Sequence, residues 1–209
     1  MLRVGLTGSI AVGKSFVSSV LAGLGCHVLD ADATAREVVA PGGEGLRRVV
    51  EAFGPGILGA DGALDRARLG RLVFADEGKR QLLNSLLHPL IIAAQDGWLR
   101  ERAREDPAGV AVIDAALMIE TGSYGRFDKI VVAHCRDEVQ LERLMRRDNL
   151  SREDAARRVA AQMPQAEKMR HADFLIDTSG TREETRVRTA DVYERLRALA
   201  SRRAVEENL

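Results

Sequence analysis

The residues from Gly8 to Ser15 follow the pattern GxxxxGK[ST], in which glycines precede a lysine and a hydroxyl side chain. Glycines allow backbone N–H groups to turn toward phosphate oxygens, and a helix that begins at the lysine adds the positive end of its dipole. We expect Lys14 to neutralise the β and γ phosphates of a nucleotide and the Ser15 hydroxyl to bind Mg²⁺. The predicted nucleotide-binding residues are Ser9, Ile10, Ala11, Val12, Gly13, Lys14, Ser15 and Phe16.

Two carboxylates, Asp30 and Asp32, follow a short apolar segment that is typical of a strand. The carboxyl ends of strands in an open α/β sheet line the ligand crevice, so either carboxylate could accept or orient the proton of an acceptor hydroxyl. An aspartate there caps a helix equally well, and we give this role to Asp30 as readily as chemistry, whereas we expect chemistry of Asp32. Asp114 also closes an apolar strand, either as a carboxylate that reaches Mg²⁺ or as a simple strand end.

Arg143 and Arg147 are four residues apart and lie on one face of a predicted helix, opposite an apolar stripe that includes Leu144. From a helix packed on the core, both guanidinium groups can reach a shared ligand. The alternative is that they are solvated surface charges.

Short apolar segments that alternate with helical patterns must position these groups. This alternation predicts a parallel sheet flanked by helices, which is an α/β fold of the P-loop NTPase type. The predicted strands are residues 2–7, 27–29, 110–113, 129–133 and 174–176. A last helix from about Thr181 is expected to close the sheet with an apolar face that includes Val187 and Leu196.

Two segments lack the strand pattern and read as insertions. Residues 31–106 are helical, and we expect them to bind the acceptor. Residues 148–171 are rich in arginine and poor in apolar residues, so we expect a mobile lid that excludes water from the transferring group. The nucleotide-binding core then consists of residues 1–30, 107–147 and 172–209.

Composition narrows the function further. The chain of 209 residues has 31 basic and 31 acidic side chains, and this neutral balance argues against bulk nucleic-acid binding. Cys26 and Cys135 stand alone, which argues against a disulfide framework and indicates a cytoplasmic compartment. The apolar runs are too short to span a membrane. No asparagine is followed by lysine, so the guanine-reading NKxD motif of GTPases is missing. A small-molecule kinase is favoured, and the oligomeric state stays open.

Together with these motifs, the whole sequence resembles the dephospho-CoA kinase family almost from end to end. The phosphate loop alone specifies only a superfamily, but three further motifs are more specific. They are Asp30-Ala31-Asp32 with Ala35-Arg36-Glu37, then Asp61-Gly62-Ala63-Leu64-Asp65-Arg66, and His88-Pro89; Gln162 also matches the family.

The resemblance implies transfer of the γ-phosphoryl group of Mg-ATP to the 3′-hydroxyl of dephospho-CoA. It implies that Asp32 is the catalytic base, that Lys14 stabilises charge on the transferring group, and that Arg143 and Arg147 are lid arginines on the ATP phosphates. Arg66, His88 and Glu120 match positions of the acceptor pocket. From the residues themselves, Arg66 could instead be a surface ion-pair partner, and His88, which precedes a proline, could end a helix.

Three departures from the family pattern stand out. Ser9 and Ala11 replace loop glycines, the segment before Glu120 lacks a proline, and Thr178 stands where the family has an asparagine near the adenine. The last change leaves the preference between ATP and GTP open. Two alternatives remain, namely another small-metabolite or nucleoside monophosphate kinase, and a nucleotide-dependent binding or regulatory module.

Overall fold

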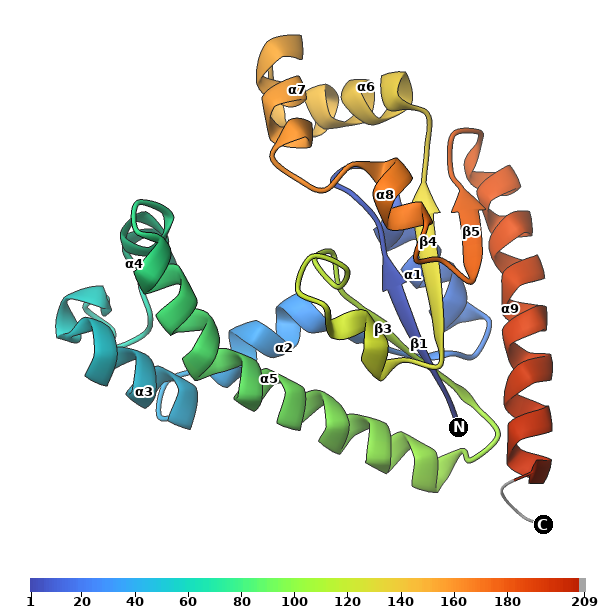
Figure 1. The fold of residues 1–209 in the computed structure, drawn as a ribbon, viewed down its shortest axis with the longest axis horizontal. Coiled ribbons are helices and arrows are strands. Elements are labelled where there is room, and N and C mark those ends of the chain that lie inside the picture. Colours follow the sequence, from blue (N-terminus) through green and yellow to red (C-terminus); the bar gives the residue numbers. More distant parts are fainter. Residues whose placement is uncertain (207–209) are drawn as a thin grey trace. The chain divides into compact units, whose positions relative to one another are not determined.

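The computed structural model describes residues 1–206, which divide into two compact units (Figure 1). The first, called the sheet unit here, comprises residues 1–29 and 101–206. The second, the helical unit, comprises Asp30–Arg100.

The sheet has five strands in the order β2-β3-β1-β4-β5. Strand β1 pairs in parallel with β3 and β4, and β4 pairs in parallel with β5. The strands are β1 Leu2–Thr7, β2 His27–Asp30, β3 Val110–Asp114, β4 Lys129–His134 and β5 Phe174–Asp177. The predicted parallel α/β sheet is therefore confirmed, and the carboxyl ends of the central strands lie at one edge.

Helices α1 (Lys14–Gly23) and α9 (Arg182–Glu206) pack on one face of the sheet. Alternate β1 side chains such as Leu6 point toward them, because successive residues of a strand face opposite sides. Leu196 of α9 is fully buried in this core, as expected. The prediction that Val187 lies in the apolar face of α9 is wrong, because this side chain is exposed. Thr185 and Thr189 are buried nearby instead. Each of these hydroxyls can be buried because it donates a hydrogen bond to a carbonyl one turn earlier in the helix.

The opposite face of the sheet packs against the chain between β3 and β4, which includes the 3₁₀ turn η2 (Ser123–Arg126). Met118 from this segment lies over Gly5 of β1. A Cβ at Gly5 would come within 2.4 Å of the Met118 Sδ, so only glycine allows this close approach. Helix α8 (Gln165–Met169) contacts β4, and α6 (Asp137–Asp148) and α7 (Arg152–Ala160) complete the sheet unit.

The helical unit contains α2 (Ala31–Val38), α3 (Glu44–Phe53), the 3₁₀ turn η1 (Pro55–Ile57) and α4 (Arg66–Phe74). It has its own apolar core, with Val39, Val49, Ile57 and Leu69 buried together. An isolated bridge between Leu58 and Leu64 is the β-pairing that the structure shows between α2 and α4, in keeping with the predicted helical character of this segment.

Helix α5 (Glu77–Glu105) corrects the expectation that His88 ends a helix, because the helix continues through His88 and Pro89. Proline removes one backbone donor and disfavours helix in the residue before it, but this is a local cost. Leu83 and Leu87, on the turns before the proline, pack on the core of the helical unit and offset it. Neither α5 nor any other helix within residues 1–206 is both long and apolar enough to cross a membrane.

Both cysteines are buried and free. Burial raises the pKa of the Cys26 thiol to about 12, and burial also raises the pKa of Cys135. Buried thiols with raised pKa values are unreactive.

Asp128 ties β1 to the end of α9. Its carboxylate accepts hydrogen bonds from the Arg3 backbone and guanidinium at 2.8–3.2 Å, and it forms an ion pair with Arg203 at 2.7 Å. Burial opposes ionisation, but the hydrogen bonds from the two arginines outweigh it and lower the pKa of Asp128 to about 2. Such a carboxyl stabilises the fold above its unfolded pKa, and this contribution is lost as the pH falls toward 2.

We expect Asp128→Asn to lower the free energy of unfolding by about 2 kcal/mol at pH 7, because the amide cannot pair with two guanidinium groups. The difference from the unmodified protein should shrink as the pH falls from 4 toward 2. Urea unfolding across this pH range measures it, with Asp191→Asn at an exposed α9 position as the control. A difference that does not depend on pH contradicts the role of the Asp128 charge.

Candidate active site

The predicted phosphate loop connects the end of β1 to the start of α1, with the backbone N–H groups of the first turn of α1 at its end. Gly13, immediately before α1, has φ of 90°, which favours glycine. A Cβ there would also lie 3.4 Å from the Thr178 Oγ1 and 3.5 Å from the Arg143 Nη1. Ser15 is exposed in the first turn of α1. The Arg182 guanidinium lies over the Phe16 ring, with its Cζ 5.6 Å from the ring centroid. The loop geometry therefore suits an anion at a helix N-terminus.

Lys14 forms an ion pair with Asp114, the last residue of β3. Asp114 is only 8% exposed, so this carboxylate is well shielded from water beside the loop. The contact with Lys14 places this carboxylate at the phosphate loop, whereas its approach to Mg²⁺ stays a prediction.

Arg143 reaches the loop from α6. Its Nη2 donates to the Thr178 carbonyl at 2.7 Å, and its Nη1 donates to the Thr178 Oγ1 at 3.2 Å. The Thr178 hydroxyl also donates a hydrogen bond to the Val12 carbonyl of the loop. Arg143 is thus held at the loop rather than free on the surface.

Arg147 lies one turn further along α6, where its Nε donates to the Asp148 carboxylate at 2.8 Å. Arg158 of α7 donates to the same carboxylate at 2.8 Å. The hydrogen bond from Arg147 holds the pKa of Asp148 below its ordinary value. Two guanidinium groups therefore gather around one carboxylate at the junction of α6 and α7.

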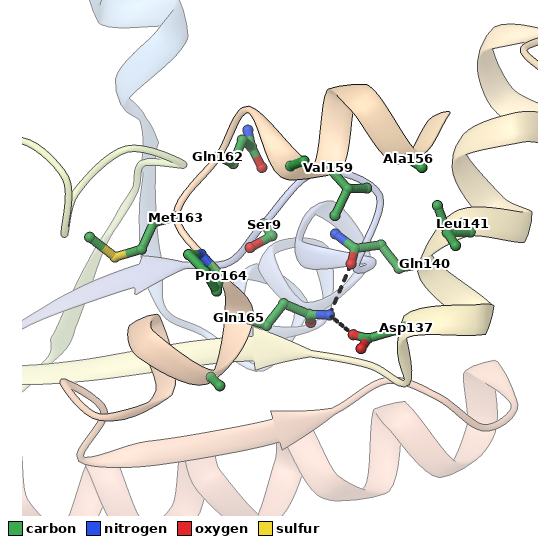
Figure 2. Close-up of a pocket in the computed structure, with 12 residues that line it drawn as sticks. Ser9, Asp137, Gln140, Leu141, Ala156, Val159, Gln162, Met163, Pro164 and Gln165 are labelled. Atoms are coloured by element: carbon green, nitrogen blue, oxygen red, sulfur yellow. Dashed lines mark hydrogen bonds between the residues drawn. The ribbon is translucent and has the colours of Figure 1, made fainter. Parts of the chain in front are cut away.

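A cavity of about 550 Å³ lies beside the loop, between α6, α7 and the chain that leads into α8 (Figure 2). Ser9 lies at its wall, and its buried Oγ has no hydrogen-bond partner among the described residues. Gln140 and Gln162 also line the cavity, and both bond the backbone of Ile10. The sequence marked Gln162 as a match to the family but indicated no role for either glutamine, because a glutamine in an amphipathic helix or a turn looks like an ordinary surface residue.

Glu120 is held by a lysine that sequence reasoning did not select. Lys168 of α8 is fully buried, and its Nζ lies 2.7 Å from the Glu120 Oε1 and 2.8 Å from the Ala116 carbonyl. The Thr7 hydroxyl, at the end of β1, donates to the same carbonyl. Lys168 therefore fixes the segment after β3, together with Glu120, against the carboxyl edge of the sheet.

Asp30 and Asp32 belong to the helical unit and have different environments. The Asp30 carboxylate caps α2, accepting from the N–H groups of Asp32 and Ala33 at 2.8 and 3.2 Å, so the capping interpretation is confirmed. Asp32 is exposed in the first turn of α2. Its carboxylate is thus not needed as a cap.

Arg66 and His88, two of the three predicted acceptor residues, also lie in the helical unit. Arg66 is the first residue of α4, and its Nη2 donates to the Arg36 carbonyl at 3.3 Å. His88 is exposed on α5. Glu120, the third, belongs to the sheet unit.

A parallel α/β sheet whose central strand leads through a GxxxxGKS loop into a helix, with a buried carboxylate beside the loop lysine, defines a P-loop kinase. A family model described as dephospho-CoA kinase matches residues 2–184. The chain therefore belongs to the dephospho-CoA kinase family, and the resemblance recognised in its sequence is confirmed.

Relatives and solved structures agree with this family. A dephospho-CoA kinase of Geobacter sulfurreducens is 46% identical over 190 residues, which cover 91% of this chain and 96% of the relative. One of Geobacillus kaustophilus is 44% identical over 88% of this chain and 92% of its own length. A crystal structure of a Thermus thermophilus protein is 31% identical, with a TM-score of 0.75, and covers 92% of this chain and 97% of that one. The prediction of an ATP-dependent kinase is confirmed by the family.

Proposed function

We propose that this protein transfers the γ-phosphoryl group of ATP to the 3′-hydroxyl of dephospho-CoA, and so forms coenzyme A and ADP. The observation that carries the proposal is the complete phosphate loop, with Lys14 and Asp114 paired beside it, in a chain of the dephospho-CoA kinase family. Phosphoryl transfer needs positioning and charge stabilisation more than covalent chemistry from the protein, and these groups supply both.

On the donor side, residues 9–16 form the phosphate site and bind the phosphates through backbone N–H groups other than that of Ile10, which donates to Gln162. Lys14 neutralises charge that develops on the transferring group. Ser15 and Asp114 offer the hard oxygen ligands that Mg²⁺ prefers, and both lie next to Lys14 in sequence or in space. Mg²⁺, when bound with ATP, neutralises part of the charge on the β and γ phosphates. Ser15 is the residue we assign to the metal.

On the acceptor side, Asp32 orients the attacking hydroxyl and accepts its proton late in the transfer, because an ionised carboxylate is a weak base at pH 7. Arg66, His88 and Glu120 bind the acceptor, and residues 31–106 form the acceptor-binding segment. Residues 148–171 close as a lid that excludes water. The cytoplasmic location and the absence of a nucleic-acid partner stay predictions.

Arg143→Ala and Arg147→Ala should each lower kcat/KM about 10-fold or more while the fold stays intact, because both guanidinium groups act on phosphate charge in the transition state. Initial rates with varied ATP, together with thermal unfolding, measure the two effects. Arg146→Ala, at an exposed α6 position between them, is the matched control and should behave like the unmodified protein. Unchanged rates in both variants contradict a role of the two guanidinium groups in phosphoryl transfer.

The test of the function is ADP release from Mg-ATP by the purified protein, with dephospho-CoA beside nucleosides, nucleoside monophosphates and small sugars. Strong stimulation by dephospho-CoA alone is the expected result. Stimulation by a different acceptor keeps a P-loop kinase but overturns this substrate. If no acceptor stimulates ADP release, a nucleotide-dependent binding module is favoured. The next measurement is then RNA affinity at increasing salt, which should fall steeply for such a module.

A further inference from the structure

Two glutamine side chains from outside the phosphate loop bind both polar groups of the Ile10 backbone. The Gln162 Oε1 accepts from the Ile10 N–H at 2.7 Å. The Gln140 Nε2 donates to the Ile10 carbonyl at 2.7 Å. Gln140 comes from α6 and Gln162 from the chain just after α7, and Figure 2 shows both side chains. The loop is thus held from two elements far away in sequence.

The residue next to this contact has an unfavourable backbone conformation. Ala11 has φ of 59°, a left-handed conformation that a side chain with a Cβ adopts at a cost. The Ile10 carbonyl is part of the peptide that joins Ile10 to Ala11, so the bond from Gln140 fixes the orientation of that peptide. An alanine here therefore depends on external restraint more than a glycine would.

Gln140 is itself held in place by Gln165. The Gln165 Nε2 donates to the Gln140 Oε1 at 2.9 Å and to the Asp137 carboxylate at 3.1 Å. Gln165 also exchanges hydrogen bonds with the backbone of Cys135, at 3.1 and 3.2 Å. Gln140 is 1% exposed. Because its buried amide oxygen accepts from Gln165, its Nε2 must face the Ile10 carbonyl.

We propose that Gln140 and Gln162 are positioning residues that hold the Ile10–Ala11 peptide of the phosphate loop in its nucleotide-binding conformation. The inference rests on the proposed function of the loop. Neither side chain is assigned a contact with the reacting atoms; each acts through the backbone of Ile10. Since Gln162 lies within residues 148–171, the restraint also makes ATP affinity depend on the position of that segment.

The first test is Gln162→Ala, because Gln162 is only half-buried and its loss should leave the fold intact. Isothermal titration with Mg-ATP should give a Kd about fivefold higher than that of the unmodified protein (about 1 kcal/mol). The KM for ATP should rise by a similar factor, whereas kcat at saturating ATP should change less than twofold. Glu142→Ala, an exposed position of α6, is the control and should bind ATP normally.

The decisive test adds Ala11→Gly to the Gln162→Ala variant. Glycine tolerates a positive φ at no steric cost, so ATP affinity should return most of the way to that of the unmodified protein. Ala11→Gly alone, with both glutamines in place, is the reference variant with which the affinity of the double variant is compared. A loss of packing at residue 162 would not be repaired by this change.

Gln140→Ala should give a larger loss of ATP affinity, also reduced by Ala11→Gly, with thermal unfolding as a check on the fold. The inference is overturned if Gln162→Ala binds ATP within twofold of the unmodified protein, or if Ala11→Gly leaves its defect unchanged. ATP titration does not involve dephospho-CoA, so these outcomes are separate from a failure of the proposed acceptor.

Discussion

Replacing Lys14 by alanine should lower kcat/KM with ATP and dephospho-CoA by about 10³-fold, the size of effect seen when one preorganised charge-stabilising group is removed from an active site. Two physical changes add up. The variant loses the cation that neutralises the transferring phosphoryl group, and it leaves Asp114, which is 8% exposed, without its partner. An uncompensated carboxylate beside the loop then repels the ATP phosphates.

The measurement is the steady-state rate of ADP release, with unfolding in urea to show that the fold remains. Lys129→Ala is the matched control: Lys129 also forms an ion pair, with Asp173 at 2.8 Å, but it begins β4 and so lies at the opposite end of the strands from the loop. We expect that variant to keep its activity. Activity of Lys14→Ala within tenfold of the unmodified protein contradicts the role of Lys14.

The strands and the phosphate loop could be predicted because their signals are local. A buried parallel strand is a short apolar run, and the loop needs glycine, lysine and serine at fixed spacing, so both appear in a few consecutive residues. The cap formed by Asp30 is local too, since its partners are two and three residues away. Such features depend little on the rest of the fold.

Long-range partners could not be predicted in this way. Lys168 looks like a charge in a polar segment, yet it is fully buried, because Glu120 pairs with its charge and the Ala116 carbonyl accepts a hydrogen bond from its ammonium group. Both partners lie about 50 residues earlier in the chain. Gln140 lies 130 residues from Ile10. Pairing at such separations is decided by the arrangement of elements, which periodicity does not encode.

The role of Thr178 is visible only in the folded structure. In the sequence it is a departure from the family asparagine. In the structure its hydroxyl contacts the Val12 carbonyl and lies 3.0 Å from the His134 carbonyl, and it accepts from Arg143. The threonine therefore joins the phosphate loop to β4 and α6, a structural role that the sequence comparison alone does not reveal.

Replacing Asp32 by asparagine should lower kcat by 10²- to 10⁴-fold, the usual contribution of a group that orients and deprotonates a hydroxyl. ATP affinity should change less than twofold, because the donor phosphates bind through residues 9–16. The exposed position of Asp32 in the first turn of α2 predicts little effect on stability, since Asp30 caps that helix. The combination of a large loss of kcat with unchanged ATP affinity is what distinguishes a role in chemistry from a role in binding.

Asp30→Asn is the matched control for this experiment. An asparagine oxygen still accepts the N–H groups of Asp32 and Ala33, and asparagine is as good a cap as aspartate, so turnover should stay within a few-fold of the unmodified protein. Single-turnover rates with saturating ATP and dephospho-CoA separate the transfer step from product release. If Asp32→Asn also turns over within a few-fold of the unmodified protein, Asp32 is not the group that accepts the proton of the acceptor hydroxyl, because no amide can accept that proton at neutral pH.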